Sequence, residues 1–206
     1  MWIYLIRHAE TDGNKHRIVQ TPNTPLSSNG SVQAEHLASA YSGKDISLII
    51  CSDYARTQAT AAPLHKILKC KLELNPMLRE RNFGDLRGQS YDDIADDFFA
   101  PAYRPPGGET HGAFVSRVRN AWQYVINTGA TQEGDIMIMT HGLVVRCILQ
   151  DILKITQEQL AQSEVKNTCV SKISCQYPHQ TALVCDVSHL PVNVKTDAED
   201  KTQGAV

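Results

Sequence analysis

The chain has 206 residues, 42% of them hydrophobic and 20% charged, and its formal net charge is −2. This length and composition are typical of one globular domain and exclude a wholly disordered or low-complexity chain. The charge balance lacks the surplus of Lys and Arg with which nucleic-acid-binding proteins neutralise phosphate backbones. We therefore expect no nucleic-acid partner.

Apolar runs in the sequence are short. The longest, 47–51 and 136–139, fall far below the roughly 20 residues that span a bilayer, and the opening run 1–6 is cut off by Arg7 and His8. We expect no membrane segment, no signal peptide and a cytoplasmic location. The six cysteines show neither Cys-x-x-Cys pairs nor zinc-ligand spacing, so we also expect reduced thiols, no metal and no cofactor.

The first part of the chain alternates strand-like and helical patterns. In chain order we predict a strand at 2–6, a helix capped by Ser27 or Ser28 that reaches Tyr41, a strand at 47–51, a helix capped by Ser52 or Asp53 that runs to Leu68, and a weaker strand at 72–74. Because Pro63 removes a backbone donor, we expect it to kink or divide its helix. This alternation is typical of an α/β fold with a mostly parallel sheet.

The second part of the chain begins with a break in this alternation at 84–108, which we expect to form an excursion over the sheet. We then predict a helix from Glu109 that Gly129 ends, a strand at 135–140, a helix at 143–153, and two late strands at 169–175 and 182–187 joined by a turn at Pro178. The fold class is thus a three-layer α/β sandwich with helices on both faces of the sheet. We expect one domain over residues 1–194 and a disordered polar tail at 195–206.

Arginine and histidine side chains follow three of the predicted strands. Arg7 and His8 follow the first strand, Arg56 opens the helix after the second, and His141 follows the strand at 135–140. The carboxyl ends of parallel strands meet at one edge of a sheet. Guanidinium groups cannot lose their charge, so their convergence indicates a bound anion. We predict that the anion is a phosphate.

A cysteine nucleophile is an alternative, since Cys51 and Arg56 nearly match the Cys-x5-Arg loop of cysteine-dependent phosphatases. The spacing is one residue short, and the loop lacks glycines. We therefore favour a buried strand thiol for Cys51.

Six motifs in order resemble the histidine phosphatase superfamily, which is also called phosphoglycerate mutase-like, over roughly residues 1–188. The matching segments are Arg7-His8-Ala9-Glu10-Thr11 with Asn14 and Gln20, Pro25–Gly30, Ser52–Ala61, Leu78–Gly88, Pro106–Thr110 and Thr140–Gly142. The chain departs from the family pattern at Ala9, where a Gly is usual, and at Thr21, where Gln-Gly is common.

The resemblance implies a mechanism. His8 is implied to be the nucleophile, with one ring nitrogen attacking phosphorus while the other donates to a backbone carbonyl. Glu80 matches the family's acid, which protonates the leaving group and then acts as base toward water; Glu10 is a rival for this role. The implied phosphate-binding residues are Arg7, Asn14, Arg56 and His141, and the further candidates for substrate binding are Gln20 and Arg81.

Three functions follow as hypotheses. We favour a phosphomonoester hydrolase acting on a small phosphorylated metabolite. A cofactor-dependent phosphoglycerate mutase is the alternative, but this chain has Gly13 where those mutases usually carry Trp, and it lacks their longer mid-chain insertion. The third hypothesis is an inactive scaffold that binds a phosphorylated ligand. The four aspartates at 92–97 are expected to disfavour highly anionic ligands, and the sequence predicts neither the substrate nor the oligomeric state.

Overall fold

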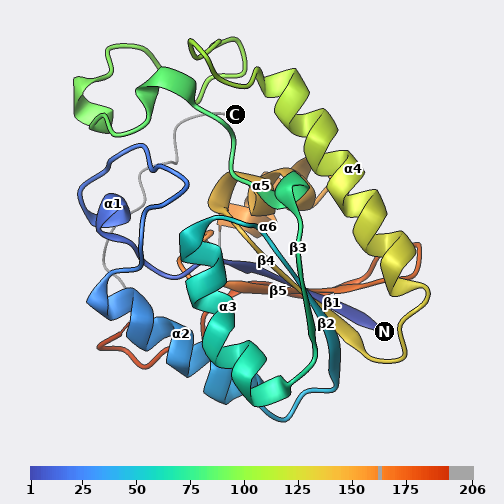
Figure 1. Ribbon diagram of the computed structural model, residues 1–206. Coiled ribbons are helices and arrows are strands. Elements are labelled where there is room, and N and C mark those ends of the chain that lie inside the picture. The colour runs from blue at the N-terminus through green and yellow to red at the C-terminus, as the bar shows by residue number, and fades with distance from the viewer. Residues whose placement is uncertain (162–163, 195–206) are drawn as a thin grey trace.

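A six-stranded sheet with strand order β3-β2-β4-β1-β5-β6 forms the centre of the computed structural model, which describes residues 1–161 and 164–194 (Figure 1). The strands are β1 (Trp2–Arg7), β2 (Ile46–Cys51), β3 (Lys71–Leu74), β4 (Asp135–Thr140), β5 (Val170–Ser174) and β6 (Thr181–Asp186). The first four strands pair in parallel, whereas β5 and β6 add as an antiparallel pair beside β1. The prediction of a mostly parallel α/β sheet is confirmed.

Helices cover both faces of the sheet because the strand side chains alternate in direction. Ile3 and Leu5 belong to one core cluster, with the buried faces of α4 (His111–Gly129) and α5 (Gly142–Cys147). Tyr4 and Ile6 belong to the other, with the buried faces of α2 (Ser28–Tyr41) and α3 (Ala55–Leu68). The polar residues that follow the strands are thereby left at the sheet edge between two packed layers.

Short elements complete the chain. They are the helices α1 (Asp12–Lys15) and α6 (Gln157–Ala161), a π-helical turn at Ile148–Ile152, and 3₁₀ turns at Pro76–Leu78, Gly84–Leu86 and Tyr91–Asp93. Neither α1 nor α6 was predicted, since four or five residues carry too little periodicity to show in a sequence. The predicted helix at 143–153 is α5 followed by the π-helical turn.

The start of α2 confirms its prediction, whereas the start of α3 differs from it. Ser27 caps α2, accepting a hydrogen bond from the N–H of Gly30 at 2.9 Å. Neither Ser52 nor Asp53 caps α3, which begins after Tyr54 with no side-chain cap, and Pro63 does not divide the helix. Asp53 is instead paired with Arg79, which explains why it is unavailable as a cap.

The long helix α4 also corrects two expectations. It begins at His111 rather than at Glu109, and Thr110 caps it by accepting from the N–H of Ala113 at 3.2 Å. Gly129 is the last helical residue but does not end the helix through a left-handed turn, because the residue after it is still right-handed. A Cβ at Gly129 would lie 2.6 Å from Cys175 Sγ, so this glycine allows close packing. The predicted disordered tail, 195–206, lies outside the described residues.

Within residues 1–161 and 164–194, no helix has the length and apolar character needed to cross a bilayer.

We predict that Gly30→Ala destabilises the protein by about 1–3 kcal/mol, a typical cost of overpacking. A Cβ at Gly30 would lie 2.0 Å from the carbonyl oxygen of Glu10, so the backbone just after His8 must move. Urea unfolding measures the change. Gly112→Ala is the matched control, because it also lies in the first turn of a helix but has no neighbour within 4 Å. Equal midpoints for the two variants would contradict the prediction.

Candidate active site

The carboxyl ends of β1, β2 and β4 meet at one edge of the sheet. The register pairs Arg7 with Thr140, and the N–H of His8 continues the ladder by donating to the carbonyl of Thr140 at 2.9 Å. On the other side of β4, the N–H of Ser52 donates to the carbonyl of Met139 at 2.9 Å. The sheet therefore sets the backbone positions at which Arg7, His8 and His141 leave their strands.

A cavity opens at this edge. Seven of the eight predicted site residues line it: Arg7, His8, Asn14, Gln20, Arg56, Glu80 and Arg81. Its remaining lining consists of Val19, Tyr54, Phe83, Arg87, Tyr91, Phe99, Gly142, Leu143, Arg146 and Val165. His141 does not line the cavity, although its neighbours Gly142 and Leu143 do.

The His8 imidazole is buried and held at both ring nitrogens. Nδ1 lies 2.7 Å from the carbonyl oxygen of Ala9, which can only accept, so Nδ1 carries the proton. Nε2 accepts a hydrogen bond from Arg56 Nε at 3.2 Å. Burial lowers the pKa of His8 well below its usual range, and the charges of Arg56 and Arg7 lower it further. The ring is thus neutral, with its lone pair on Nε2.

Two guanidiniums flank this imidazole. Arg56 is 2% exposed and donates to the carbonyl of Thr21 at 3.0 Å. Burial lowers its pKa to about 10, so it stays charged at neutral pH. Arg7 is also buried, and its Nη1 donates to the carbonyl of Val165 at 2.6 Å. Two like charges held this close favour an anion between them.

The His141 ring lies close to the His8 ring. Its ring centroid lies 5.3 Å from that of His8, and its Nε2 forms a hydrogen bond of 2.8 Å with Ser52 Oγ. Burial, followed by the charge of Arg56, lowers its pKa well below the usual range. Nδ1 is buried and has no hydrogen-bond partner within the described part of the chain. A ligand reaching this edge would find Nδ1 as an unused polar atom.

Asn14 is fixed by a residue that the sequence analysis missed. Its Oδ1 accepts from the N–H and Oγ1 of Thr11 at 3.1 and 2.9 Å, and from Asn167 Nδ2 at 3.4 Å. The amide group that Asn14 can offer to a ligand is therefore its Nδ2 donor. Asn167 Nδ2 also donates to the carbonyl of His8 at 3.0 Å. No motif marks Asn167, which lies in the loop before β5.

The Glu80 carboxyl is the acid of the cavity. Its Oε1 accepts from the N–H of Arg81 and its Oε2 from the N–H of Leu143, both at 3.1 Å. Burial raises the pKa of Glu80, and the two backbone donors and the nearby guanidiniums oppose this rise without cancelling it. A carboxyl with a raised pKa keeps its proton to higher pH, as a general acid requires.

The two substrate-binding candidates differ in their surroundings. Gln20 Oε1 is buried and has no hydrogen-bond partner among the residues that the structure describes. Arg81 is 3% exposed, and it donates to the carbonyls of Tyr103 and Glu109 at 3.0 and 3.3 Å. Arg81 is therefore tied to the backbone on one side while it borders the cavity on the other.

Neither rival catalytic group lines the cavity. Glu10 accepts from Ser27 Oγ at 2.6 Å and pairs with Lys15 Nζ at 3.1 Å, which occupies its carboxylate. Cys51 is fully buried, and burial raises the pKa of its thiol to about 12. A thiol that stays protonated is not a nucleophile.

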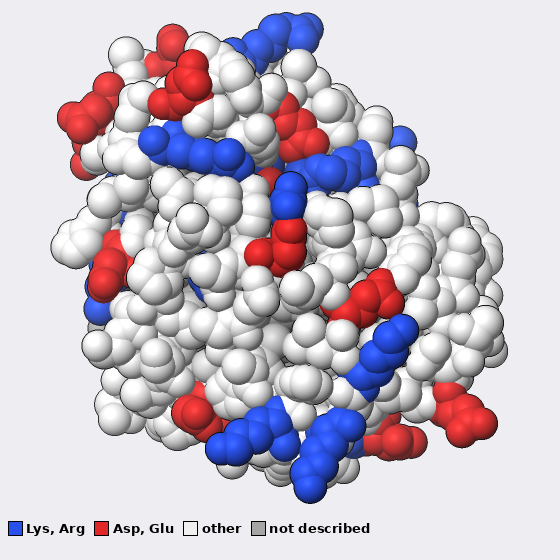
Figure 2. All heavy atoms as spheres, in the orientation of Figure 1, with Lys and Arg blue, Asp and Glu red and all other residues white. Residues whose placement is uncertain are grey.

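The aspartates of segment 84–108 do not face the cavity. Acidic side chains gather at the upper left of Figure 2, over this segment, and Asp92, Asp93, Asp96 and Asp97 are exposed. The lining contains five arginines and one acid, Glu80. None of these four aspartates lines the cavity, and the expectation that they disfavour highly anionic ligands stays a prediction. No three His, Cys, Asp or Glu side chains gather as a metal site within residues 1–161 and 164–194.

Comparison with known proteins identifies the family. The model of the histidine phosphatase superfamily (branch 1) matches residues 3–186. The chain belongs to this superfamily.

Several members resemble the chain over most of its length. "Probable phosphoglycerate mutase GpmB" of Photorhabdus laumondii is 27% identical over 185 residues, which cover 85% of each chain. The structure of Bacillus stearothermophilus YhfR is 26% identical, with a TM-score of 0.80 over 91% of this chain and 98% of that one. A mycobacterial glucosyl-3-phosphoglycerate phosphatase, 20% identical with a TM-score of 0.77 over 90% and 99%, shares the fold.

We predict that His8 stays neutral, as the Nδ1–H tautomer, when the pH falls from 7 to 6. A lowered pKa means that protonation begins only at lower pH than for an ordinary imidazole, whose pKa is near 6.5. Long-range ¹H–¹⁵N NMR of the imidazole nitrogens measures tautomer and charge, with the exposed His16 as the internal reference. A protonated His8 ring at pH 6 would contradict the prediction.

Proposed function

We propose that this protein is a phosphomonoester hydrolase that cleaves a small phosphorylated metabolite through a phosphohistidine on His8. The observation that carries the proposal is the meeting of a neutral imidazole, two buried guanidiniums and a half-buried carboxyl in one cavity. Membership of the histidine phosphatase superfamily supports a phosphatase enzyme.

The first proposed step transfers the phosphoryl group to the enzyme. His8 Nε2 attacks phosphorus as the bond to the leaving oxygen breaks, and the proton of Glu80 moves to that oxygen. The negative charge on the phosphoryl oxygens is held by Arg7, Arg56, Asn14 Nδ2 and His141 Nδ1, so that the charge is stabilised where it is concentrated. The loss of the hydrogen bond between His8 Nε2 and Arg56 Nε frees both atoms for the phosphoryl group.

The second proposed step releases phosphate. Glu80, now ionised, takes a proton from water as the water oxygen attacks phosphorus and the N–P bond breaks. His8 returns to its neutral form, with the Nδ1 proton still directed at the carbonyl of Ala9. Apart from the attacking water, no group outside the chain and the substrate enters either step.

The remaining lining supports a small anionic substrate. Arg87 and Arg146 border the same cavity as the aromatic rings of Tyr91 and Phe99, and they add positive charge to that of the phosphate-binding arginines. The proposal also includes Gln20 and Arg81 as substrate contacts, residues 1–194 as one domain, and segment 84–108 as its cap. It further includes a cytoplasmic, metal-independent enzyme with no nucleic-acid or membrane partner.

A phosphoglycerate mutase is the second candidate function, because curated relatives at 26–28% identity carry that name. A mutase returns the phosphoryl group from the histidine to its substrate, whereas a phosphatase gives it to water. The two functions share the first step and differ in the acceptor of the phosphoryl group in the second step.

We predict that His8→Ala lowers kcat at least about 10³-fold and abolishes the acid-labile phosphoenzyme, because no other cavity residue matches the family's nucleophile. Phosphate release measures kcat, and mass spectrometry of the quenched enzyme measures the phosphoenzyme. A His8→Ala enzyme with full activity in a clean preparation would refute the proposed nucleophile.

We also predict that Glu80→Gln lowers kcat with an alkyl phosphate about 10²–10⁴-fold, which is the usual contribution of a general acid. The same phosphate-release assay measures this loss.

Hydrolase and mutase are separated by one incubation with 3-phosphoglycerate and catalytic 2,3-bisphosphoglycerate. We expect slow release of free phosphate and no rapid formation of 2-phosphoglycerate, because the chain departs from the mutase pattern at Gly13. Rapid 2-phosphoglycerate formation without phosphate release would establish the mutase instead. A chain inert toward a broad panel of phosphomonoesters would favour the ligand-binding scaffold.

A further inference from the structure

We propose that Arg117 and Glu109, which lie outside the cavity lining, form a clamp that positions Glu80 for proton transfer. The inference rests on the proposed function, in which Glu80 is the acid. It assigns Arg117 and Glu109 the role of positioning residues rather than catalytic ones.

The acid needs such a device because of where it lies in the chain. Residues 79–83 belong to no helix or strand, and they connect the 3₁₀ turns Pro76–Leu78 and Gly84–Leu86. The nucleophile, by contrast, directly follows β1. A carboxyl on an irregular segment has no ladder of backbone hydrogen bonds to hold its position.

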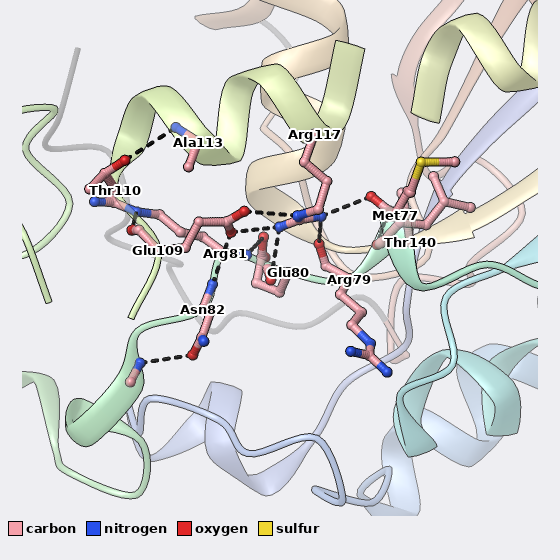
Figure 3. A network of polar contacts seen from close by, with 12 residues as sticks. Met77, Arg79, Glu80, Arg81, Asn82, Glu109, Thr110, Ala113, Arg117 and Thr140 are labelled. Atoms are coloured by element: carbon pink, nitrogen blue, oxygen red, sulfur yellow. Dashed lines mark hydrogen bonds and ion pairs between the residues drawn. The ribbon is translucent and has the colours of Figure 1, made fainter. Parts of the chain in front are cut away.

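The Arg117 guanidinium supplies those bonds from α4 (Figure 3). Nη1 donates to the carbonyls of Met77 and Arg79, both at 2.8 Å, and Nη2 donates to the carbonyl of Glu80 at 3.4 Å. Three carbonyls at and before the acid are thus bound by one rigid fork. The short Arg79 contact fixes the residue directly before Glu80.

Glu109 binds both the Arg117 guanidinium and the backbone of Asn82, which follows Glu80 in the chain. Its Oε1 accepts from Arg117 Nε at 2.9 Å and its Oε2 from Arg117 Nη2 at 2.7 Å. Its Oε2 also accepts from the N–H of Asn82 at 3.3 Å, and its own N–H donates to the carbonyl of Asn82 at 2.7 Å. The segment is therefore held on both sides of Glu80, by Arg117 before it and by Glu109 after it.

The donors of Arg117 are fully used. A guanidinium has five N–H groups, and these five hydrogen bonds provide an acceptor for each one. The side chains of Arg117 and Glu109 are only 21% and 15% exposed. A lysine cannot reproduce this set, because its ammonium has three donors and no planar fork.

The clamp acts on the reaction through the direction of the carboxyl. With its backbone fixed, Glu80 reaches the N–H of Leu143 at the start of α5, which holds Oε2 at the cavity. A displacement of about 1 Å at a proton donor costs up to about 10²-fold in rate. Loss of the clamp is therefore expected to impair proton transfer while leaving the phosphate-binding groups on the strand ends in place.

Leaving groups of different basicity test this. An alkoxide leaving group needs the proton of Glu80, whereas p-nitrophenolate leaves without it. The measurement is the rate of His8 phosphorylation, by rapid quench, with glycerol phosphate and with p-nitrophenyl phosphate. Arg117→Met keeps the apolar stem beside Phe114 and removes the fork. Arg119→Met, on the exposed side of the same helix, is the matched control.

We expect Arg117→Met to slow phosphorylation by glycerol phosphate about 10–100-fold and phosphorylation by p-nitrophenyl phosphate less than about threefold. Arg119→Met should change neither rate. Arg117→Lys should recover part of the loss, because it restores the charge opposite Glu109 but not the full fork. The alkaline limb of the glycerol phosphate profile should move to lower pH, since a less buried Glu80 has a lower pKa and loses its proton earlier.

If Arg117→Met loses the same factor in phosphorylation rate with both substrates, or loses none with either, the proposed clamp is refuted. If Arg117→Met does not fold, as judged by circular dichroism and urea unfolding, Glu109→Gln is measured and judged by the same outcomes. Glu80→Gln in the same assay separates this inference from the proposed function. A wild-type enzyme that forms no phosphohistidine, or a Glu80→Gln enzyme without the leaving-group effect, would refute the proposed function itself.

Discussion

The site depends on one interaction, in which a neutral imidazole lies between a carbonyl and a guanidinium. His8 gives its only proton to Ala9 and presents its lone pair to Arg56. A protonated ring could not lie 3.2 Å from Arg56 Nε, because two positive groups would face each other in a buried place. The charge of Arg56 and Arg7 therefore keeps the His8 ring neutral and provides the attraction for an anion at the same time.

The polar residues that follow the strands and the Glu80 carboxyl are supported in different ways. Arg7, His8 and His141 leave a sheet whose strands fix the backbone within a ladder of hydrogen bonds. Glu80 lies on an irregular segment, and side-chain contacts take the place of the ladder. One of these is the pairing of Asp53 with Arg79, which connects this segment to the end of β2 and lowers the pKa of Asp53. Two backbone N–H groups hold the Glu80 carboxyl itself, and these side-chain contacts hold the segment that carries it.

Much of this architecture is readable from the sequence, because periodicity and motif order are local signals. The alternation of Ile3 and Leu5 with Tyr4 and Ile6 predicts a strand buried on both faces, and the strand ends predict where the arginines meet. Features that depend on distant partners are not readable in this way. Asn167 contacts His8 across 159 positions, and no spacing rule connects them.

Caps and glycines were misjudged for the same physical reason. Asp is a residue type that commonly caps helices, yet the Asp53 carboxylate accepts a charge-assisted hydrogen bond from Arg79 instead. Gly129 has the position of a helix terminator, yet it is needed for its small size against Cys175.

The loop before β5 has a further consequence, since Val165, Asn167 and Thr168 form hydrogen bonds that hold Arg7 and His8. His8 is synthesised long before these three residues, so its imidazole gains this support only after the loop before β5 has been made and has packed against β1.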